Sequence, residues 1–353
     1  MDGTAIVYTH GLFDTNAAKT SHGLVRGSSR YNIVGIIDEN HVGKDAGVVL
    51  EGKSAGIPFF ASIQSYLDKT GQTPDYCIIG IANAGGKMNP DWYPDLKTAL
   101  KAGISLVSGM HEFMSEIPEL VSLAEQHGAQ LIDVRKPKDR DDLHFWSARI
   151  DEVPSLKVAV MGTDCAVGKR TTAKFLVEAC EAAGIKAQMI YTGQTGWLQG
   201  GQYGFVLDST FNDFVSGELE HAMYQCYQET KPDVMFIEGQ AALRNPSGPC
   251  GSEFLVSGMA DAVILVTPAG RVYYKGWDHT GRKIPPLSTE VELIKLYGVP
   301  TIGIAINTKL VDHAEAKRLQ AAYEDDLGIP VALPVEEGVE PLITALQTQL
   351  KQR

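Results

Sequence analysis

Short apolar runs alternate with amphipathic stretches along the first half of the chain. Apolar runs bounded by turn residues predict buried β-strands, and apolar residues at helical spacing predict helices. The predicted strands are Ala5–Tyr8, Ile33–Asp38, Tyr76–Ala82, Ile104–Val107 and Gln130–Val134, and the clearest helices between them are Ser62–Lys69 and Tyr93–Ala102. Strands that alternate with helices form mostly parallel sheets, and ligands bind near the carboxyl ends of such strands. The first half is therefore predicted to be an α/β domain.

A charged segment separates this half from a second one with the same alternation. Arg135–Asp142 reads RKPKDRDD, which is typical of a solvated connector, and we place the domain boundary near residue 150. The second half contains the predicted strands Leu156–Met161, Gln188–Tyr191, Val234–Glu238, Ala262–Thr267 and Thr301–Asn307, with a helix at Ala173–Ala183. The sequence thus predicts two α/β domains, residues 1–150 and residues 151–353, each with a mostly parallel sheet.

Composition narrows the class of protein. The 353 residues include 31 Lys and Arg against 43 Asp and Glu, and the resulting net charge of −12 argues against binding to nucleic acid or to anionic lipid. The five cysteines are odd in number and form no CxxC pair, so we expect neither a disulfide framework nor a metal site. No apolar run is long enough to cross a bilayer, and the amino terminus lacks a signal-peptide pattern. We expect a cytoplasmic protein with no membrane partner.

The strongest chemical signal follows the strand Leu156–Met161 directly. There the chain reads GTDCAVGKRTT, and a helical pattern comes next. This order is typical of a phosphate-binding P-loop, in which backbone N–H groups and a helix N-terminus surround a phosphate and the lysine adds a full charge. We expect Lys169 to be exposed when no phosphate is bound. The predicted phosphate-binding residues are Gly162, Thr163, Asp164, Cys165, Ala166, Val167, Gly168, Lys169, Arg170 and Thr171.

Two departures from the usual P-loop pattern change its interpretation. Five residues separate Gly162 from Gly168, where the usual motif has four, so Thr163 takes the place of the first glycine. The Ser or Thr that follows the lysine and binds Mg²⁺ is replaced by Arg170. Thr171 comes one residue later, which is about 100° further round the helix. These departures weaken the case for Mg-assisted ATP chemistry and leave the case for phosphate binding intact.

Other polar residues follow predicted strands of the second domain. Glu238 ends a strand and precedes Gly239, so we expect its side chain to emerge half-buried at the sheet edge, as a metal ligand, a general base or a solvated carboxylate. The segment TGQTG follows another strand, and in P-loop folds such a strand end faces the phosphate loop. Its predicted cofactor-binding residues are Gln194, Thr195 and Gly196.

Two glycine-containing segments allow more than one interpretation. Asp213, Gly217 and Glu220 share one helix face, which either lines a pocket or is a solvated face beside a close helix contact. In the first domain, GIANAGGK follows a strand and is either a ligand-approach loop or a plain tight turn. Its candidate substrate-binding residues are Asn83, Gly85 and Gly86.

The sequence resembles known families at these motifs. The loop GTDCAVGK is similar to the GTDTxVGK loop of dethiobiotin synthetase. Over nearly the whole chain, the sequence resembles the DUF1611 family, on the segments GIANAGGK, SLVSGMHEFM, IDVRKP, GTDCAVGKRTT, TGQTG, DFVSGELE and FIEGQAAL. This resemblance implies an N-terminal Rossmann-like domain, a C-terminal P-loop NTPase-like domain, and N-acetyl transfer from acetyl-CoA to D-glutamate in D-amino acid catabolism.

The candidate residues are compatible with this implied chemistry. A P-loop can hold the phosphates of coenzyme A without hydrolysis, and Arg170 would be an additional phosphate partner. Acetyl transfer to an amine needs a general base, and the candidate bases are Glu238, Asp164 and Asp213. An acidic D-amino acid has two carboxylates that should meet cations. The candidate cations, among which the sequence does not choose, are Arg244, Arg271 and Lys275.

Alternative functions remain open at this point. The P-loop alone favours a kinase or a carboxylate-activating ligase that uses Mg-ATP. A nucleotide-sensing module without enzymatic activity is a third hypothesis. Two α/β domains with many apolar strands are also compatible with a homo-oligomer.

Overall fold

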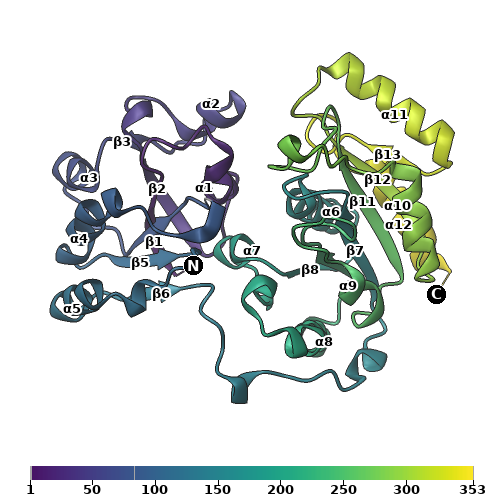
Figure 1. Cartoon of the computed structure of the whole chain (residues 1–353), viewed down its shortest axis with the longest axis horizontal. Coiled ribbons are helices and arrows are strands. Elements are labelled where there is room, and N and C mark those ends of the chain that lie inside the picture. The colour runs from purple at the N-terminus through teal and green to yellow at the C-terminus, as the bar shows by residue number, and fades with distance from the viewer. Residues whose placement is uncertain (1, 83, 353) are drawn as a thin grey trace. The chain divides into compact units, whose positions relative to one another are not determined.

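The computed structural model describes residues 2–82 and 84–352, and the chain forms two compact units whose elements are labelled in Figure 1. The first unit contains the chain up to Lys138 together with Gln194–Gly201. The second contains Asp139–Gly193 and everything from Gln202 onward. The boundary expected near residue 150 therefore falls inside the second unit. The predicted ligand-contact residue Asn83 lies outside the described residues.

Six parallel strands form the sheet of the first unit, in the order β3-β2-β1-β4-β5-β6. This is the strand order of a Rossmann fold, in which the order reverses between β1 and β4. The strands are β1 Gly3–Tyr8, β2 Tyr31–Ile37, β3 Phe59–Phe60, β4 Tyr76–Ile79, β5 Ser105–Ser108 and β6 Leu131–Asp133. The helices are α1 Lys19–Val25, α2 Ala46–Glu51, α3 Ile63–Thr70, α4 Tyr93–Lys101, α5 Pro118–His127 and α7 Gln194–Leu198.

Alternate side chains of β1 enter two different cores. Ile6 and Tyr8 pack with residues of α3, α4 and α5, whereas Ala5 and Val7 pack with residues of α1, α2 and α7. A strand that is buried on both faces needs apolar residues at successive positions. This explains why β1 reads as an uninterrupted apolar run rather than as an alternating one.

Seven parallel strands form the sheet of the second unit, in the order β13-β12-β11-β7-β10-β8-β9. The strands are β7 Leu156–Gly162, β8 Ala187–Tyr191, β9 Tyr203–Gly204, β10 Val234–Glu238, β11 Ala262–Pro268, β12 Thr301–Asn307 and β13 Val331–Ala332. The helices are α6 Lys169–Ala182, α8 Asn212–Thr230, α9 Ser252–Val256, α10 Leu287–Leu296, α11 His313–Leu327 and α12 Glu340–Lys351.

The central strand β7 is buried along its whole length and separates two apolar cores. Its residues Val158 and Val160 pack with residues of α6 and α12, while Ala159 and Met161 pack with residues of α8, α9, α10 and α11. The predicted fold class, two α/β domains with parallel sheets, is confirmed. The strands that the sequence did not predict, β3, β9 and β13, each have two residues, which is too short to produce a readable pattern. Within the described residues, no helix combines the length and apolar character that crossing a bilayer requires.

Helix α8 holds a connecting segment, which we call the strap (residues 144–150). The carboxylate of Glu220 accepts hydrogen bonds from Ser147 N at 2.7 Å and Ser147 Oγ at 2.8 Å, and that of Glu218 accepts one from His144 N at 3.0 Å. A Cβ on Gly217 would stand 1.9 Å from His144 O. Gly217 and Glu220 therefore lie in close contact with the strap, and they do not line a pocket together with Asp213. Asp213 is exposed in the first turn of α8.

Gly217→Ala is expected to lower the free energy of unfolding by about 1–3 kcal/mol, because the added methyl group overpacks the contact with the strap. The loss should occur although alanine is the better helix former. Urea denaturation measures it, with Gln228→Ala at an exposed position of α8 as the control. A Gly217→Ala protein as stable as the control would show that the strap is not held at this point.

Candidate functional site

The phosphate-binding loop lies between the end of β7 at Gly162 and the start of α6 at Lys169. Ala166 and Gly168 have positive φ angles of 51° and 102°, which turn the chain sharply into the helix. A Cβ on Gly162 would stand 2.8 Å from Val167 Cγ2, so only glycine fits where the loop leaves the strand. The loop is anchored to the neighbouring strand because Thr163 N donates to Val266 O at 3.0 Å.

The loop and helix start together provide anion-binding donors. Gly168 caps α6 without a side-chain hydrogen bond. In the described part of the chain, the backbone hydrogen bonds outside helices and strands include no N–H of Ala166, Val167, Gly168 or Lys169 as donor. Successive N–H groups at a helix N-terminus form an anion site, so this geometry suits a phosphate.

Lys169 is buried, contrary to the expectation that it would be exposed. Its side chain is 7% exposed, and Nζ donates to Asp164 O at 2.8 Å and to Ala241 O at 2.7 Å. The two carbonyl groups come from the loop itself and from the segment after β10. Burial lowers the pKa of Lys169 to about 8, although nearby acidic groups act to raise it.

Asp164 is fully buried, and its carboxylate joins three segments of the second unit. Oδ2 accepts from Arg271 Nη1 and from Lys275 N, each at 2.8 Å. Oδ1 accepts from Asn245 Nδ2 at 2.9 Å and from Cys165 N at 2.7 Å. Both oxygens already accept two hydrogen bonds each, one of them from a charged guanidinium group. This carboxylate is therefore poorly placed to take a proton from a substrate.

Glu238 ends β10, the strand next to β7, and its side chain is 5% exposed. It is thus more deeply buried than the half-buried position expected from the sequence. Its Oε2 accepts from Thr192 N at 3.2 Å, and the Thr192 hydroxyl donates to the backbone oxygen of Glu238 at 2.6 Å. Gln240 Nε2 donates to the same hydroxyl at 2.9 Å. The negative charge of Glu238 also raises the pKa of Lys169, so the carboxylate lies near the phosphate loop.

The three candidate cations have different surroundings. Arg244 pairs with Glu290 at 2.6 Å and is thereby held away from other anions. Arg271 pairs with Asp164 at 2.8 Å and also donates to Cys165 O at 2.9 Å. Lys275 is half-buried, and within the described ranges no carboxylate forms an ion pair with it.

Several predicted site residues lie elsewhere or have other contacts. Gln194 belongs to the first unit, where Arg135 Nη2 donates to its Oε1 at 2.9 Å. The Thr195 hydroxyl lies 3.3 Å from that of Thr20, and Gly196 is buried in the same helix, α7. These residues pack within the first unit, and their role in cofactor binding stays a prediction.

Four more predicted residues belong to the glycine loop of the first unit and to the start of α6. Gly86 is buried, and a Cβ there would stand 2.3 Å from His111 Cδ2, whereas Gly85 is exposed. Arg170 and Thr171 lie half-buried in the first turn of α6. Sequence reasoning missed Asn245, which stands in no recognised motif, and assigned no role to Thr192, the first residue of TGQTG. Only the folded chain brings Asn245 to Asp164 and Thr192 to Glu238.

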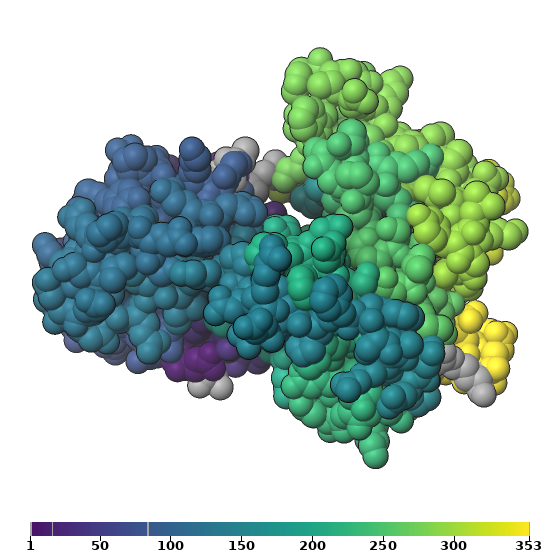
Figure 2. All heavy atoms as spheres, turned by 60° about the horizontal axis from the view of Figure 1, so that its bottom comes forward, coloured from purple at the N-terminus to yellow at the C-terminus, as the bar shows by residue number. Residues whose placement is uncertain are grey.

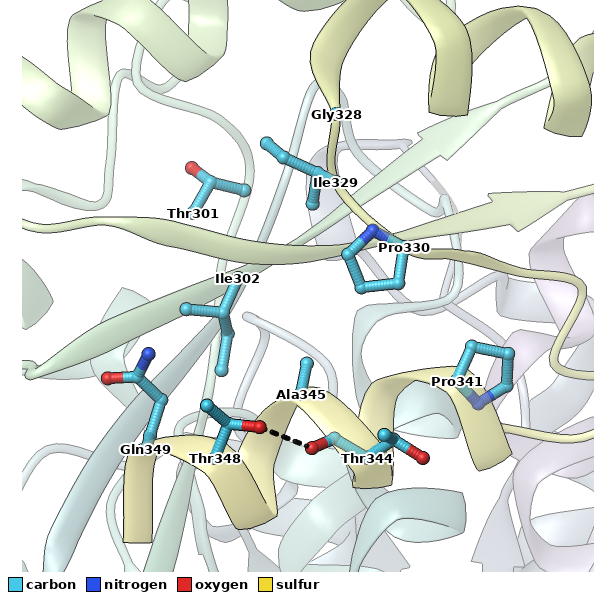
Figure 3. A pocket seen from close by; sticks show the side chains of 10 residues that line it. All are labelled: Thr301, Ile302, Gly328, Ile329, Pro330, Pro341, Thr344, Ala345, Thr348 and Gln349. Atoms are coloured by element: carbon cyan, nitrogen blue, oxygen red, sulfur yellow. Dashed lines mark hydrogen bonds between the residues drawn. The ribbon is translucent and has the colours of Figure 1, made fainter. Parts of the chain in front are cut away.

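A shallow groove lies at the other end of the second unit's sheet (Figure 3). It is lined by Thr301, Ile302, Gly328, Ile329, Pro330, Pro341, Thr344, Ala345, Thr348 and Gln349. Thr301 is the first residue of β12, whereas Asn307, the last, donates from Nδ2 to Val167 O in the phosphate loop at 3.0 Å. Because α/β sheets bind ligands at the carboxyl ends of their strands, we place the site at the loop and not at this groove.

The described residues contain no group of three or more His, Cys, Asp or Glu side chains arranged to hold a metal ion. The candidate site consists of the phosphate loop, the buried side chains of Lys169 and Glu238, and the segments that Asp164 joins to the loop.

The affinity for sulfate, which keeps its charge, is expected to fall about 10-fold between pH 7 and pH 9. Sulfate should bind the ammonium form of Lys169, whose pKa of about 8 means that most of the free protein loses this proton across that range. The sulfate-dependent rise in Tm at each pH gives the affinity. Lys169→Met should bind sulfate more weakly and without this pH dependence; the same fall in that variant would assign it to another group.

The chain is similar to known proteins over both of its units. The P-loop domain described as "Domain of unknown function (DUF1611_C) P-loop domain" matches residues 144–343, and the corresponding N-terminal Rossmann-like domain, DUF1611_N, matches residues 39–137. A D-glutamate N-acetyltransferase of Pseudoalteromonas sp is 30% identical over 276 residues, which are 76% of this chain and 80% of that protein. One of Tritonibacter scottomollicae is 31% identical over 280 residues, with the same coverage of both chains.

A solved structure extends the similarity to the full length. The crystal structure of a DUF1611 family protein from Anabaena variabilis is 30% identical, has a TM-score of 0.88, and matches 98% of this chain and 99% of its own. Since the P-loop domain model covers more than half of the residues and the relatives match both units, the chain belongs to the DUF1611 family.

Proposed function

We propose that this protein transfers an acetyl group from acetyl-CoA to the amino group of D-glutamate. The observation that carries the proposal is the phosphate loop with Arg170 in the position of the magnesium-binding hydroxyl. Such a loop suits a ligand that is held by its phosphates and is not cleaved at them. Two relatives that are 30% and 31% identical to this chain are named D-glutamate N-acetyltransferases, and these names support the reaction and the substrate.

Coenzyme A carries a pyrophosphate and a separate 3′-phosphate. The backbone N–H groups at the start of α6 and the ammonium group of Lys169 are suited to the pyrophosphate. Lys169 would exchange its two carbonyl acceptors for phosphate oxygens, and the gain of an anionic partner would favour its charged form. The loop therefore supplies binding and orientation, while the acetyl group reacts elsewhere in the site.

Acetyl transfer forms a C–N bond and breaks the C–S bond of the thioester. The substrate amine must first lose a proton, and the thiolate of coenzyme A leaves when the tetrahedral intermediate collapses. Glu238 is our candidate base, because it is buried near Lys169 at the end of the strand beside the phosphate loop. Removal from water makes a carboxylate a stronger base.

One observation favours a second candidate function. A buried acid at the end of the strand beside the P-loop strand is also the place where P-loop enzymes hold Mg²⁺ through a carboxylate, and Glu238 is at that place. A kinase or carboxylate-activating ligase that uses Mg-ATP would need this acid. Arg170 argues against it, because it removes the hydroxyl that completes the metal site.

A calorimetric titration should give tight binding of acetyl-CoA and of CoA and much weaker binding of Mg-ATP. In a thiol-release assay, acetyl-CoA with D-glutamate should produce free CoA faster than acetyl-CoA with L-glutamate. The activity should persist in excess EDTA, because no step of the proposed transfer uses a metal.

The opposite results have definite meanings. Tight binding of Mg-ATP together with activity that only Mg²⁺ restores would replace acetyl transfer with the kinase or ligase function. Binding of acetyl-CoA without turnover of any amino acid would leave a nucleotide-sensing role.

Glu238→Gln is expected to lower kcat by about 10²–10⁴-fold, the range for loss of a general base. The amide keeps the shape of the side chain and accepts the Thr192 hydrogen bond, so the affinity for acetyl-CoA should change little. Glu181→Gln, at an exposed position near the end of α6, is the control. Turnover by Glu238→Gln within a few-fold of wild type would remove Glu238 from the reaction.

A further inference from the structure

Three cations belong to segments that are hydrogen-bonded to the phosphate loop: Arg271, Lys275 and Lys309. The first is already neutralised, because Arg271 Nη1 pairs with Asp164 at 2.8 Å and donates to Cys165 O at 2.9 Å. The two lysines differ from it. Among the described residues, no carboxylate forms an ion pair with either ammonium group.

The main chain fixes both lysines beside the loop. Lys275 N donates to the carboxylate of Asp164, a loop residue, at 2.8 Å. Lys309 N donates to Asn307 Oδ1 at 3.1 Å, and Asn307 Nδ2 donates in turn to Val167 O of the loop at 3.0 Å. Each lysine is thus tied to the phosphate loop through one or two hydrogen bonds, although they come from separate segments of the chain.

The three cations influence one another electrostatically. Burial lowers the pKa of Lys275, and the positive charges of Arg271 and Lys309 lower it further. The negative charge of Asp164 acts to raise the pKa of Lys275, but this carboxylate is already paired with Arg271. An anion that binds between the two lysines would therefore stabilise both. In Figure 2, the light-green surface around residue 280, part of the segment that follows Lys275, projects from the second unit.

We propose that Lys275 and Lys309 form a second anion subsite beside the phosphate loop, which binds a phosphate monoester separate from the phosphates in the loop. This inference rests on the proposed function, in which that group is the 3′-phosphate of coenzyme A. A phosphate monoester carries about −1.5 to −2 charges at pH 7, which matches two lysines that form no ion pair within the described residues. The subsite would make the protein select coenzyme A over ligands that have only one run of phosphates.

The alternative occupant is a carboxylate of the amino-acid substrate. Two features favour the phosphate. Both lysines are anchored to the loop that holds the other phosphates. Each carboxylate carries one charge, whereas a phosphate monoester brings about two charges to one position between the lysines.

The test compares CoA with 3′-dephospho-CoA, which lacks only the monoester. By calorimetry, the wild-type protein should bind CoA about 10- to 100-fold more tightly than 3′-dephospho-CoA. Lys275→Gln should lose about 10-fold in affinity for CoA and little for 3′-dephospho-CoA, so the preference shrinks. Lys275→Arg should keep the preference. Lys283→Gln, an exposed lysine of the same segment, should leave both affinities unchanged.

Lys309→Gln is the companion variant, because this exposed residue can be replaced with little risk to folding. Its preference for CoA should also shrink. Equal losses for the two ligands in both variants, or an unchanged preference, would overturn the subsite. So would an intact preference combined with a raised KM for the amino acid, since that result assigns the lysines to a carboxylate.

Failure of the subsite and failure of the proposed function give different results. Acetyl transfer by a protein that binds CoA and 3′-dephospho-CoA equally would retain the function and reject the subsite. A clear preference for the 3′-phosphate without acetyl transfer would retain the subsite and reject the function.

Discussion

The buried carboxylate of Asp164 is the interaction on which the rest of the candidate site depends. A charge taken out of water is costly unless donors and an opposite charge replace the water, and here four N–H groups do so. Those donors belong to the loop itself, to the segment containing Asn245, and to the arm containing Arg271 and Lys275. One side chain therefore fixes the relative positions of three segments that would otherwise be independent loops. Asp164, which the sequence suggested as a base, is better understood as the residue that holds the site together.

Lys169 has a related role within the loop. Its ammonium group is satisfied by two carbonyl oxygens, so a phosphate must compete with internal partners and not simply with water. This exchange favours ligands with a high local negative charge and disfavours weak anions. It also couples ligand binding to protonation, because burial has already lowered the pKa of the lysine to about 8. For the proposed phosphate ligand, the loop would thereby combine selectivity with a pH dependence that the motif alone does not imply.

The first unit illustrates why a fold does not specify a ligand. Its sheet has the Rossmann strand order, and an acid, Asp38, follows β2 where dinucleotide-binding proteins place the residue that binds a ribose. Here Asp38 is fully buried, and it accepts hydrogen bonds from the Thr9 hydroxyl at 2.8 Å and from Phe13 N at 3.0 Å. Its other oxygen lies 2.8 Å from His41 Nδ1. An acid with these internal partners stabilises the turns at the sheet edge, so the Rossmann topology carries no inference of dinucleotide binding.

Features that depend on neighbouring residues could be predicted from the sequence alone. Apolar runs predicted the central strands, and the order of strand, loop, Lys169 and helix predicted the phosphate loop, because each pattern is local. Three features became visible only in the folded chain. Asp164 meets Asn245 and Arg271, which follow it by 81 and 107 residues. Lys169 is buried, and residues 194–201 pack with the first unit. The physical reason is that β7 lies between β10 and β11, so its loop meets segments that follow those strands. A buried polar group takes its partners from whichever segments the strand order brings to it, and spacing along the chain does not contain that information.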